Sequence, residues 1–199
     1  MPRLLIAAFA LLLAGCAAAP EPAPVSSDTT TQPGRPLSDA QLQGQWWTWA
    51  ASSTEKRNPV VDDSGQWCAE DQPKDVWFFA GTFGGPVNRR CQVPAGRPLA
   101  GPAVNTYTNC DTFFTTAKGS VTLDGQLVEL RRIDPAPITF DAVRDNVLGA
   151  PTGKVDATAC GLWAWIPPLS PGEHELRVQG EFGTFKTSAR YVLTVSGSD

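Results

Sequence analysis

Two short stretches decide the fold of this 199-residue chain: residues 162–166 read Leu-Trp-Ala-Trp-Ile, and residues 76–80 read Val-Trp-Phe-Phe-Ala. Both are short, rich in aromatic and β-branched residues, and apolar at every position, which is typical of a strand buried on both faces. A sheet open to water on one side would instead alternate apolar and polar residues. We therefore expect a further layer to cover these two strands.

The covering layer is predicted to be a helix over residues 38–52. Ser38 and Gln41 fit a capping box, in which each side chain binds the other residue's backbone N–H. Trp46 and Trp49 are three positions apart and so share one helical face. We expect at least one of these two indoles to contact the apolar strands.

The rest of the chain is predicted to be β. Asp124-Gly125 is a hairpin-turn dipeptide between strands expected at 120–123 and 126–133. Pro171-Gly172 marks another turn, and the last strand alternates apolar and polar residues over 191–195. Short strands separated by Gly and Pro indicate a mainly β fold, an antiparallel β-sandwich of immunoglobulin-like or jelly-roll-like type with one N-terminal helix.

Composition excludes several classes of partner. The chain carries 16 basic and 20 acidic residues, for a formal net charge of −4, and has one His. A mildly acidic chain without basic runs binds nucleic acid poorly, because phosphate affinity comes from clustered Lys and Arg. One imidazole also leaves little for a zinc site, so no metal or other cofactor is expected.

The N-terminus has the layout of an export signal. Arg3 precedes an unbroken apolar run from Leu4 to Leu13, which is too short to span a bilayer. The run ends in Leu13-Ala14-Gly15-Cys16, which resembles the lipobox of bacterial lipoproteins. That resemblance implies cleavage before Cys16, a diacylglycerol on its thiol and a palmitate-type acyl chain on the new amino terminus; the alternative is an ordinary signal peptide that contains a Cys.

A tether is predicted after the lipidated residue. Five of the twenty residues at 17–36 are Pro, and such a stretch buries too little surface to order itself. The predicted organisation is therefore a signal peptide at 1–15, a lipidated Cys with its tether at 16–37, and one domain at 38–199. In the lipoprotein family, Asp after the Cys favours the inner membrane; Ala17 stands here, which implies the outer membrane if the cell has two.

Four cysteines remain after Cys16 is set aside: Cys68, Cys91, Cys110 and Cys160. An even number in an exported chain indicates two disulfides, with three possible pairings. Because Cys68 and Cys91 flank the 76–80 strand in one compact unit, the preferred pairing is Cys68–Cys91 with Cys110–Cys160. A redox pair is the alternative, but no two of these cysteines have CxxC spacing.

Motifs from the helix onward resemble a family of secreted bacterial proteins, and the match covers most of residues 45–196. The family implies a β-rich domain and assigns no activity. The closing Ser-Pro-Gly-x-His stretch and its two strands are also similar to the ends of bacterial immunoglobulin-like modules. The matching features are Trp46-Trp47, Asn58-Pro59, Gly65 with Cys68, residues 76–81, Arg90-Cys91 with residues 93–96, Asn105, residues 123–125 and residues 169–174.

Two polar groups are candidates for chemistry. His174 is the only imidazole base; the simpler interpretation is a half-buried strand histidine hydrogen-bonded near the turn. The acidic stretches at 62–65 and 70–71 could supply oxygens to Ca²⁺, although a turn rich in Asp, Ser and Gly explains them without a metal.

The tryptophans suggest a sugar site, because an exposed indole stacks on a pyranose ring. Trp47, Trp163 and Trp165 are the candidate ligand-binding residues, and core packing is the alternative for them. Taken together, the sequence predicts a lipid-anchored cell-envelope protein whose domain binds a ligand or supports the envelope without catalysis. A glycan-binding module is the second hypothesis, and a hydrolase of envelope or extracellular polymer using His174 or a carboxylate pair is the third.

Overall fold

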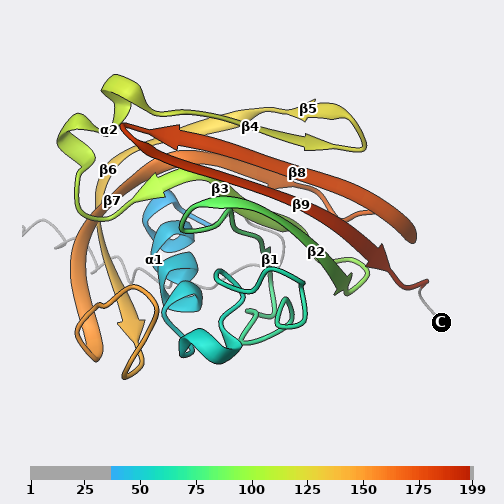
Figure 1. Ribbon diagram of the computed structural model, residues 1–199, viewed down its shortest axis with the longest axis horizontal. Helices are drawn as coiled ribbons and strands as arrows, with labels where there is room; N and C mark the ends of the chain where they lie inside the picture. Colours follow the sequence, from blue (N-terminus) through green and yellow to red (C-terminus); the bar gives the residue numbers. More distant parts are fainter. Residues whose placement is uncertain (1–36, 198–199) are drawn as a thin grey trace, which may run out of the picture. The chain divides into compact units, whose positions relative to one another are not determined.

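The computed structural model describes residues 37–197, and this part of the chain is mainly β (Figure 1). The signal peptide predicted at 1–15, the lipidation site Cys16 and the tether predicted up to residue 36 lie outside the described residues. The helices are α1 (Asp39–Ala50), the short 3₁₀ helix η1 (Glu55–Arg57) and α2 (Cys110–Thr116). The strands are β1 (Trp77–Phe78), β2 (Gly85–Val93), β3 (Leu99–Thr106), β4 (Lys118–Leu123), β5 (Gln126–Val128), β6 (Leu130–Ala142), β7 (Gly153–Ile166), β8 (Gly172–Phe182) and β9 (Phe185–Val195).

These strands form two sheets. One has the order β1-β3-β7-β6 and the other the order β2-β9-β8-β4-β5. Most neighbours are antiparallel, but β1 is parallel to β3 and β2 is parallel to β9, so the wholly antiparallel expectation was wrong at two edges. β1 lies at an edge of one sheet, and β2, the next strand in the chain, lies at an edge of the other. Neither strand pairs with the other; β1 pairs with β3 and β2 pairs with β9.

The two sheets share one apolar core. Leu99, Ala164 and Ile166 come from the four-stranded sheet, and they cluster with side chains of β4, β8 and β9 such as Val121 and Leu176. These side chains are all nearly inaccessible to solvent. The core between the sheets therefore covers one face of the apolar segment at 162–166.

Helix α1 covers the opposite face of the four-stranded sheet, where it packs chiefly against β6 (Figure 1). The ring centroids of Trp46 and Trp163 lie 5.9 Å apart, and those of Trp49 and Phe78 lie 5.8 Å apart. The expected covering layer and its indole contacts are therefore confirmed. The capping box is also present, since Ser38 Oγ accepts from the Gln41 N–H at 3.3 Å and Gln41 Oε1 accepts from the Ser38 N–H at 3.0 Å.

The predicted hairpin at Asp124-Gly125 is present, with both residues at positive φ (50° and 81°). Its second strand is shorter than the expected 126–133, because β5 ends at Val128 and β6 begins at Leu130 in the other sheet. The chain thus changes sheets at Glu129, and the flanking Val128 and Leu130 both pack on the core shared by the sheets. Among the helices of residues 37–197, none has the length and apolar character needed to cross a bilayer.

Candidate functional site

Both expected disulfides are present. Cys68 pairs with Cys91, joining the segment before β1 to strand β2, and Cys110 pairs with Cys160, joining α2 to β7. The Cα atoms are 5.8 Å apart in each pair. The four thiols are therefore used as structural bridges.

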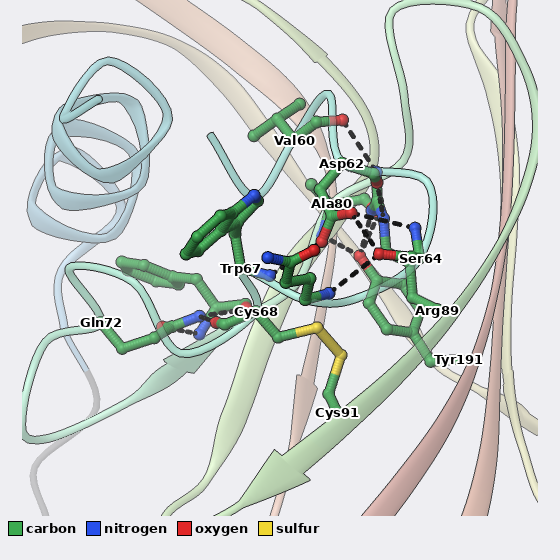
Figure 2. Close-up of a disulfide and its surroundings, with 12 residues drawn as sticks. Val60, Asp62, Ser64, Trp67, Cys68, Gln72, Ala80, Arg89, Cys91 and Tyr191 are labelled. Carbon is green, nitrogen blue, oxygen red and sulfur yellow. Dashed lines mark hydrogen bonds between the residues drawn. A yellow bond between two sulfur atoms is a disulfide. The ribbon is translucent and has the colours of Figure 1, made fainter. Parts of the chain in front are cut away.

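A buried arginine stands beside the Cys68–Cys91 bridge (Figure 2). Arg89 is only 1% exposed. Its Nε donates to the Asp62 carbonyl at 2.6 Å, its Nη2 to the Val60 carbonyl at 2.8 Å, and its Nη1 to the Ala80 carbonyl at 2.9 Å. Nη1 also donates to the Tyr191 hydroxyl and to the Gly81 carbonyl. A planar fork of donors suits this task, and it ties the loop before β1 to β2 and β9.

Sequence reasoning missed Arg89, although a signal was present. Arg89, Cys91 and Val93 alternate along β2 on its buried side. The two apolar members of that series place the arginine in the core. Only the folded loop, however, supplies the ring of carbonyls that makes a buried guanidinium tolerable.

The acidic stretch at 62–65 is a turn. Asp62 Oδ1 accepts from the backbone N–H and hydroxyl of Ser64 at 3.0 and 2.8 Å, and Oδ2 accepts from the Trp67 N–H at 2.9 Å. Burial raises the pKa of Asp62, but these hydrogen bonds together with the charge of Arg89 outweigh it and leave the pKa below its usual value. Both carboxylate oxygens are occupied by the chain, which supports the turn interpretation of this stretch rather than the Ca²⁺ interpretation.

His174 bridges two turns. Its Nδ1 lies 2.7 Å from Asp124 Oδ2, and its Nε2 lies 2.9 Å from the Ser170 carbonyl oxygen and 3.4 Å from Ser170 Oγ. The hydrogen bonds to Asp124 and to the Ser170 carbonyl raise the pKa of His174. A serine, a histidine and an aspartate do meet here, but Nε2 is closer to a carbonyl, to which it must donate, than to the hydroxyl it would need to deprotonate. His174 therefore connects the two turns by hydrogen bonds, and we call this arrangement the His174 latch.

The three candidate tryptophans occupy different surroundings. Trp163 is 1% exposed beneath Trp46, and Trp47 is 5% exposed, whereas Trp165 is 38% exposed. A platform of two exposed indoles at 163 and 165 is therefore not formed, because α1 covers the first of them. Trp47 instead forms part of a cavity wall.

The cavity, which we call the aromatic cavity, has a volume of about 440 Å³. It lies between α1, the segment after β1, strand β3, the loop between β6 and β7, and the turn between β8 and β9. Six aromatic residues line it: Trp46, Trp47, Phe83, Tyr107, Phe182 and Phe185. The other lining residues are Val60, Ala80, Gly81, Thr82, residues 102–106, Asn109, Val147, Leu148 and Thr187.

The cavity exists because β1 is short. β1 pairs only with Leu99 and Ala100 of β3, so the rest of β3 has β7 alone as a neighbour. After β1 the chain turns toward β9, where the Thr82 N–H donates to Thr187 Oγ1 at 2.5 Å. A Cβ at position 81 would overlap the Thr187 side chain, so only glycine permits this close crossing.

Trp47 and Asn105, which line the cavity, each have a side-chain nitrogen without a hydrogen-bond partner. These nitrogens, Trp47 Nε1 and Asn105 Nδ2, are covered by the protein, so they do not face the open space of the cavity. The Trp47 ring meets the Tyr107 ring edge-on, with centroids 4.7 Å apart. The lining contains no Asp, Glu, Lys, Arg or His, and burial raises the pKa of Tyr107 above its usual value near 10. The site can therefore bind an uncharged molecule, but its lining offers no acid or base that titrates near neutral pH. No local motif in the sequence marks this cavity, since its walls come from six segments that are far apart in the chain.

Comparison with protein-family models, with curated proteins and with solved structures found no match to this chain.

Proposed function

We propose that this chain is a lipid-anchored cell-envelope protein whose β-sandwich domain is a non-enzymatic binding module, with its ligand in the aromatic cavity. The observation that carries the proposal is the cavity itself. It combines six aromatic side chains with a lining that carries no charged group, around a volume of about 440 Å³. Small-molecule sites typically have volumes of about 300–1,000 Å³ and are lined mostly by apolar and aromatic side chains.

The envelope location is supported by the two disulfides, which fit an oxidising compartment outside the cytoplasm. The resemblance of residues 13–16 to a lipobox supports an anchor at Cys16. Two or more acyl chains hold a protein stably at a membrane, whereas one is marginal. A tether over 17–36 spans at most about 70 Å when fully extended, which keeps the domain near the membrane, the outer one if the cell has two.

Binding is favoured over catalysis because no acidic or basic side chain lines the cavity, and the one histidine of the chain lies elsewhere. His174 is held by Asp124 and by the Ser170 carbonyl, and it does not line the cavity. A hydrolase would need a nucleophile and a base beside its substrate pocket.

A glycan is the second candidate ligand. Asn105, Thr106 and Asn109 in the lining supply amide and hydroxyl groups, and Trp47 supplies an indole wall. This alternative predicts that oligosaccharides, rather than apolar compounds, will stabilise the protein.

Two measurements test the proposal. Metabolic labelling with a palmitate analogue should label the native chain and leave Cys16→Ser unlabelled; equal labelling of both would overturn the anchor. A thermal-shift screen of uncharged small molecules and oligosaccharides should find compounds that raise the melting temperature. Those compounds should act less on Phe83→Ala, which alters an exposed part of the cavity wall, than on Leu127→Ala, which alters an exposed apolar residue of β5. Compounds that act equally on both variants would exclude the cavity as the binding site.

A further inference from the structure

The walls of the aromatic cavity restrict the charge of its ligand. No Asp, Glu, Lys, Arg or His side chain is part of the lining. Burial raises the pKa of Tyr107, so its hydroxyl stays neutral over the physiological range of pH. Moving an ionised carboxylate or ammonium out of water without a counter-charge is strongly unfavourable. The cavity therefore favours a ligand whose buried part carries no charge.

The polar side chains over much of the wall are occupied or covered. Trp46 Nε1 donates to a backbone carbonyl at 3.0 Å, and the Thr187 hydroxyl accepts from the Thr82 N–H at 2.5 Å. The side-chain nitrogens of Trp47 and Asn105 are covered by the protein. A ligand inside the cavity therefore gains little hydrogen bonding from these residues.

The other polar side chains of the lining are confined to one segment. Thr106, Tyr107 and Asn109 follow one another at the end of β3, so they can meet one end of a ligand. Elsewhere the wall presents apolar rings, such as those of Phe182 and Phe185 at the turn between β8 and β9. A molecule with a hydroxyl on every carbon would leave most of its polar groups facing apolar side chains, without hydrogen bonds.

Phe83 forms an exposed part of the wall on a firmly held turn. Its side chain is half exposed. The Thr82 hydroxyl donates to the Gly85 carbonyl at 2.9 Å and accepts from the Gly84 N–H at 3.1 Å. Both glycines have positive φ, 143° at Gly84 and 77° at Gly85, which favours glycine there. Because the turn holds an apolar ring partly in water, a ligand that covers this ring gains favourable burial.

We propose that the aromatic cavity takes an uncharged small molecule that is apolar over most of its surface, and that Phe83 covers the outer part of this ligand. The inference rests on the proposed binding function and specifies its ligand class. Recognition comes from the shape and the apolar surface of the walls, with residues 106–109 available to one polar end.

N-phenyl-1-naphthylamine (NPN) is a suitable probe, because it is uncharged and apolar and its fluorescence rises in apolar surroundings. We expect saturable binding of one molecule per full chain. Phe83→Asn should weaken this binding about three- to tenfold through lost apolar contact, and Phe83→Leu should retain most of the affinity. Leu127→Asn makes an apolar-to-polar change at an exposed residue outside the cavity and should leave the affinity unchanged.

A second probe tests the charge. 8-Anilinonaphthalene-1-sulfonate (ANS) is NPN with one sulfonate added, and it should bind at least tenfold more weakly. Both probes are compared in high salt, which screens the net charge of −4 on the chain.

The outcomes separate this inference from the proposed function. Equal affinities for NPN and ANS, or equal affinities of Phe83→Asn and Leu127→Asn for NPN, would overturn the ligand class or the role of Phe83 and leave the binding function standing. Triacetylchitotriose that displaces NPN would assign the cavity to glycans and overturn the apolar ligand class. Failure of all three compounds to bind the native chain would count against both proposals.

Discussion

The chain buries polar groups in two neighbouring regions and treats them differently. Around Arg89 the donors meet the carbonyls of Val60, Asp62 and Ala80, which bind the loop before β1 to the sheets. Beside the aromatic cavity, Trp47 Nε1 and Asn105 Nδ2 are buried without partners, and the cavity itself has six aromatic side chains and no charged side chain in its lining. The buried guanidinium of the first region is therefore paired within the chain, whereas the second region encloses space that the chain does not fill. Burial of polar groups alone does not mark a binding site; a space left open between well-packed side chains does.

The hydrogen bonds of the Arg89 guanidinium are tested by replacing it with an apolar side chain of similar length. Arg89→Met removes the donor of the Val60, Asp62 and Gly81 carbonyls, whereas the Ala80 carbonyl still accepts from the Tyr191 hydroxyl. Each buried acceptor left unpaired costs about 1–3 kcal/mol. We expect the free energy of unfolding to fall by at least about 3 kcal/mol, measured by urea denaturation. The control is Arg90→Met, the same change at the next, exposed position of β2. Equal stability of the two variants would show that the Arg89 interactions do not hold the loop.

The packing of α1 on the four-stranded sheet is tested at Trp163, which contacts Trp46. This residue is 1% exposed and Trp165 is 38% exposed on the same strand. Trp163→Ala should cost about 3–5 kcal/mol, the usual range for removing a buried large aromatic side chain, and Trp165→Ala less than half of that. A Trp163→Ala protein of native stability that had lost affinity for a polysaccharide would contradict the core assignment and restore the platform hypothesis.

The two disulfides are expected to contribute different amounts to the stability of the domain. Cys110–Cys160 closes a loop of 50 residues and Cys68–Cys91 one of 23. The loop-closure relation gives about 4 kcal/mol for the longer loop and about 3.5 kcal/mol for the shorter one. We therefore expect the double alanine variant at 110 and 160 to melt at a lower temperature than the one at 68 and 91. The reverse order would show that the Cys68–Cys91 bridge also supports the Arg89 interactions.

The smallest effect is expected at the His174 latch. The pKa of His174 is raised by its hydrogen bonds to Asp124 and Ser170, so its contribution to stability is full below its unfolded pKa near 6.5 and is lost as pH rises through the folded value. The pKa of Asp124 is lowered chiefly by its hydrogen bond with His174, so its contribution is present above the unfolded pKa near 4 and is lost in acid.

We therefore expect the melting temperature of the native chain to exceed that of His174→Gln by more at pH 5.5 than at pH 8.5. Asp124→Asn should remove most of that difference, because the asparagine no longer stabilises the charged imidazole. A gap between native chain and His174→Gln that widened at pH 8.5 would contradict the assignment of His174 as a proton-holding latch.

The sequence was informative wherever a short pattern carries the structure. Ser38 with Gln41 predicted the start of α1, which was confirmed. Residues 162–166, apolar throughout, predicted burial on both faces; this was confirmed for Trp163, Ala164 and Ile166 but was wrong for Trp165, which is 38% exposed. The pattern misled at residues 126–133, where a continuous strand was expected and the chain changes sheets at Glu129.

The Arg89 interactions and the aromatic cavity were not predicted, because each is assembled from segments far apart in sequence. Arg89 reaches carbonyls 27 and 29 positions before it and a hydroxyl 102 positions after it. The cavity depends on β1 ending after two residues. Hydrophobic periodicity describes which face of a strand is buried, and it carries no information on where a neighbouring strand stops.

The most direct test of the aromatic cavity as a binding site is the indole N–H signal of Trp47 in a ¹⁵N–¹H NMR spectrum of the protein, assigned with Trp47→Phe. Trp49 provides an internal reference, because it does not line the cavity and its Nε1 donates to the Glu70 carbonyl at 3.0 Å. On saturation with an uncharged aromatic compound from the thermal-shift screen, the account predicts that the Trp47 signal moves, because its indole forms part of the cavity wall, while the Trp49 signal stays in place. A Trp47 signal that does not move while the compound is bound would contradict the claim that the cavity holds the ligand.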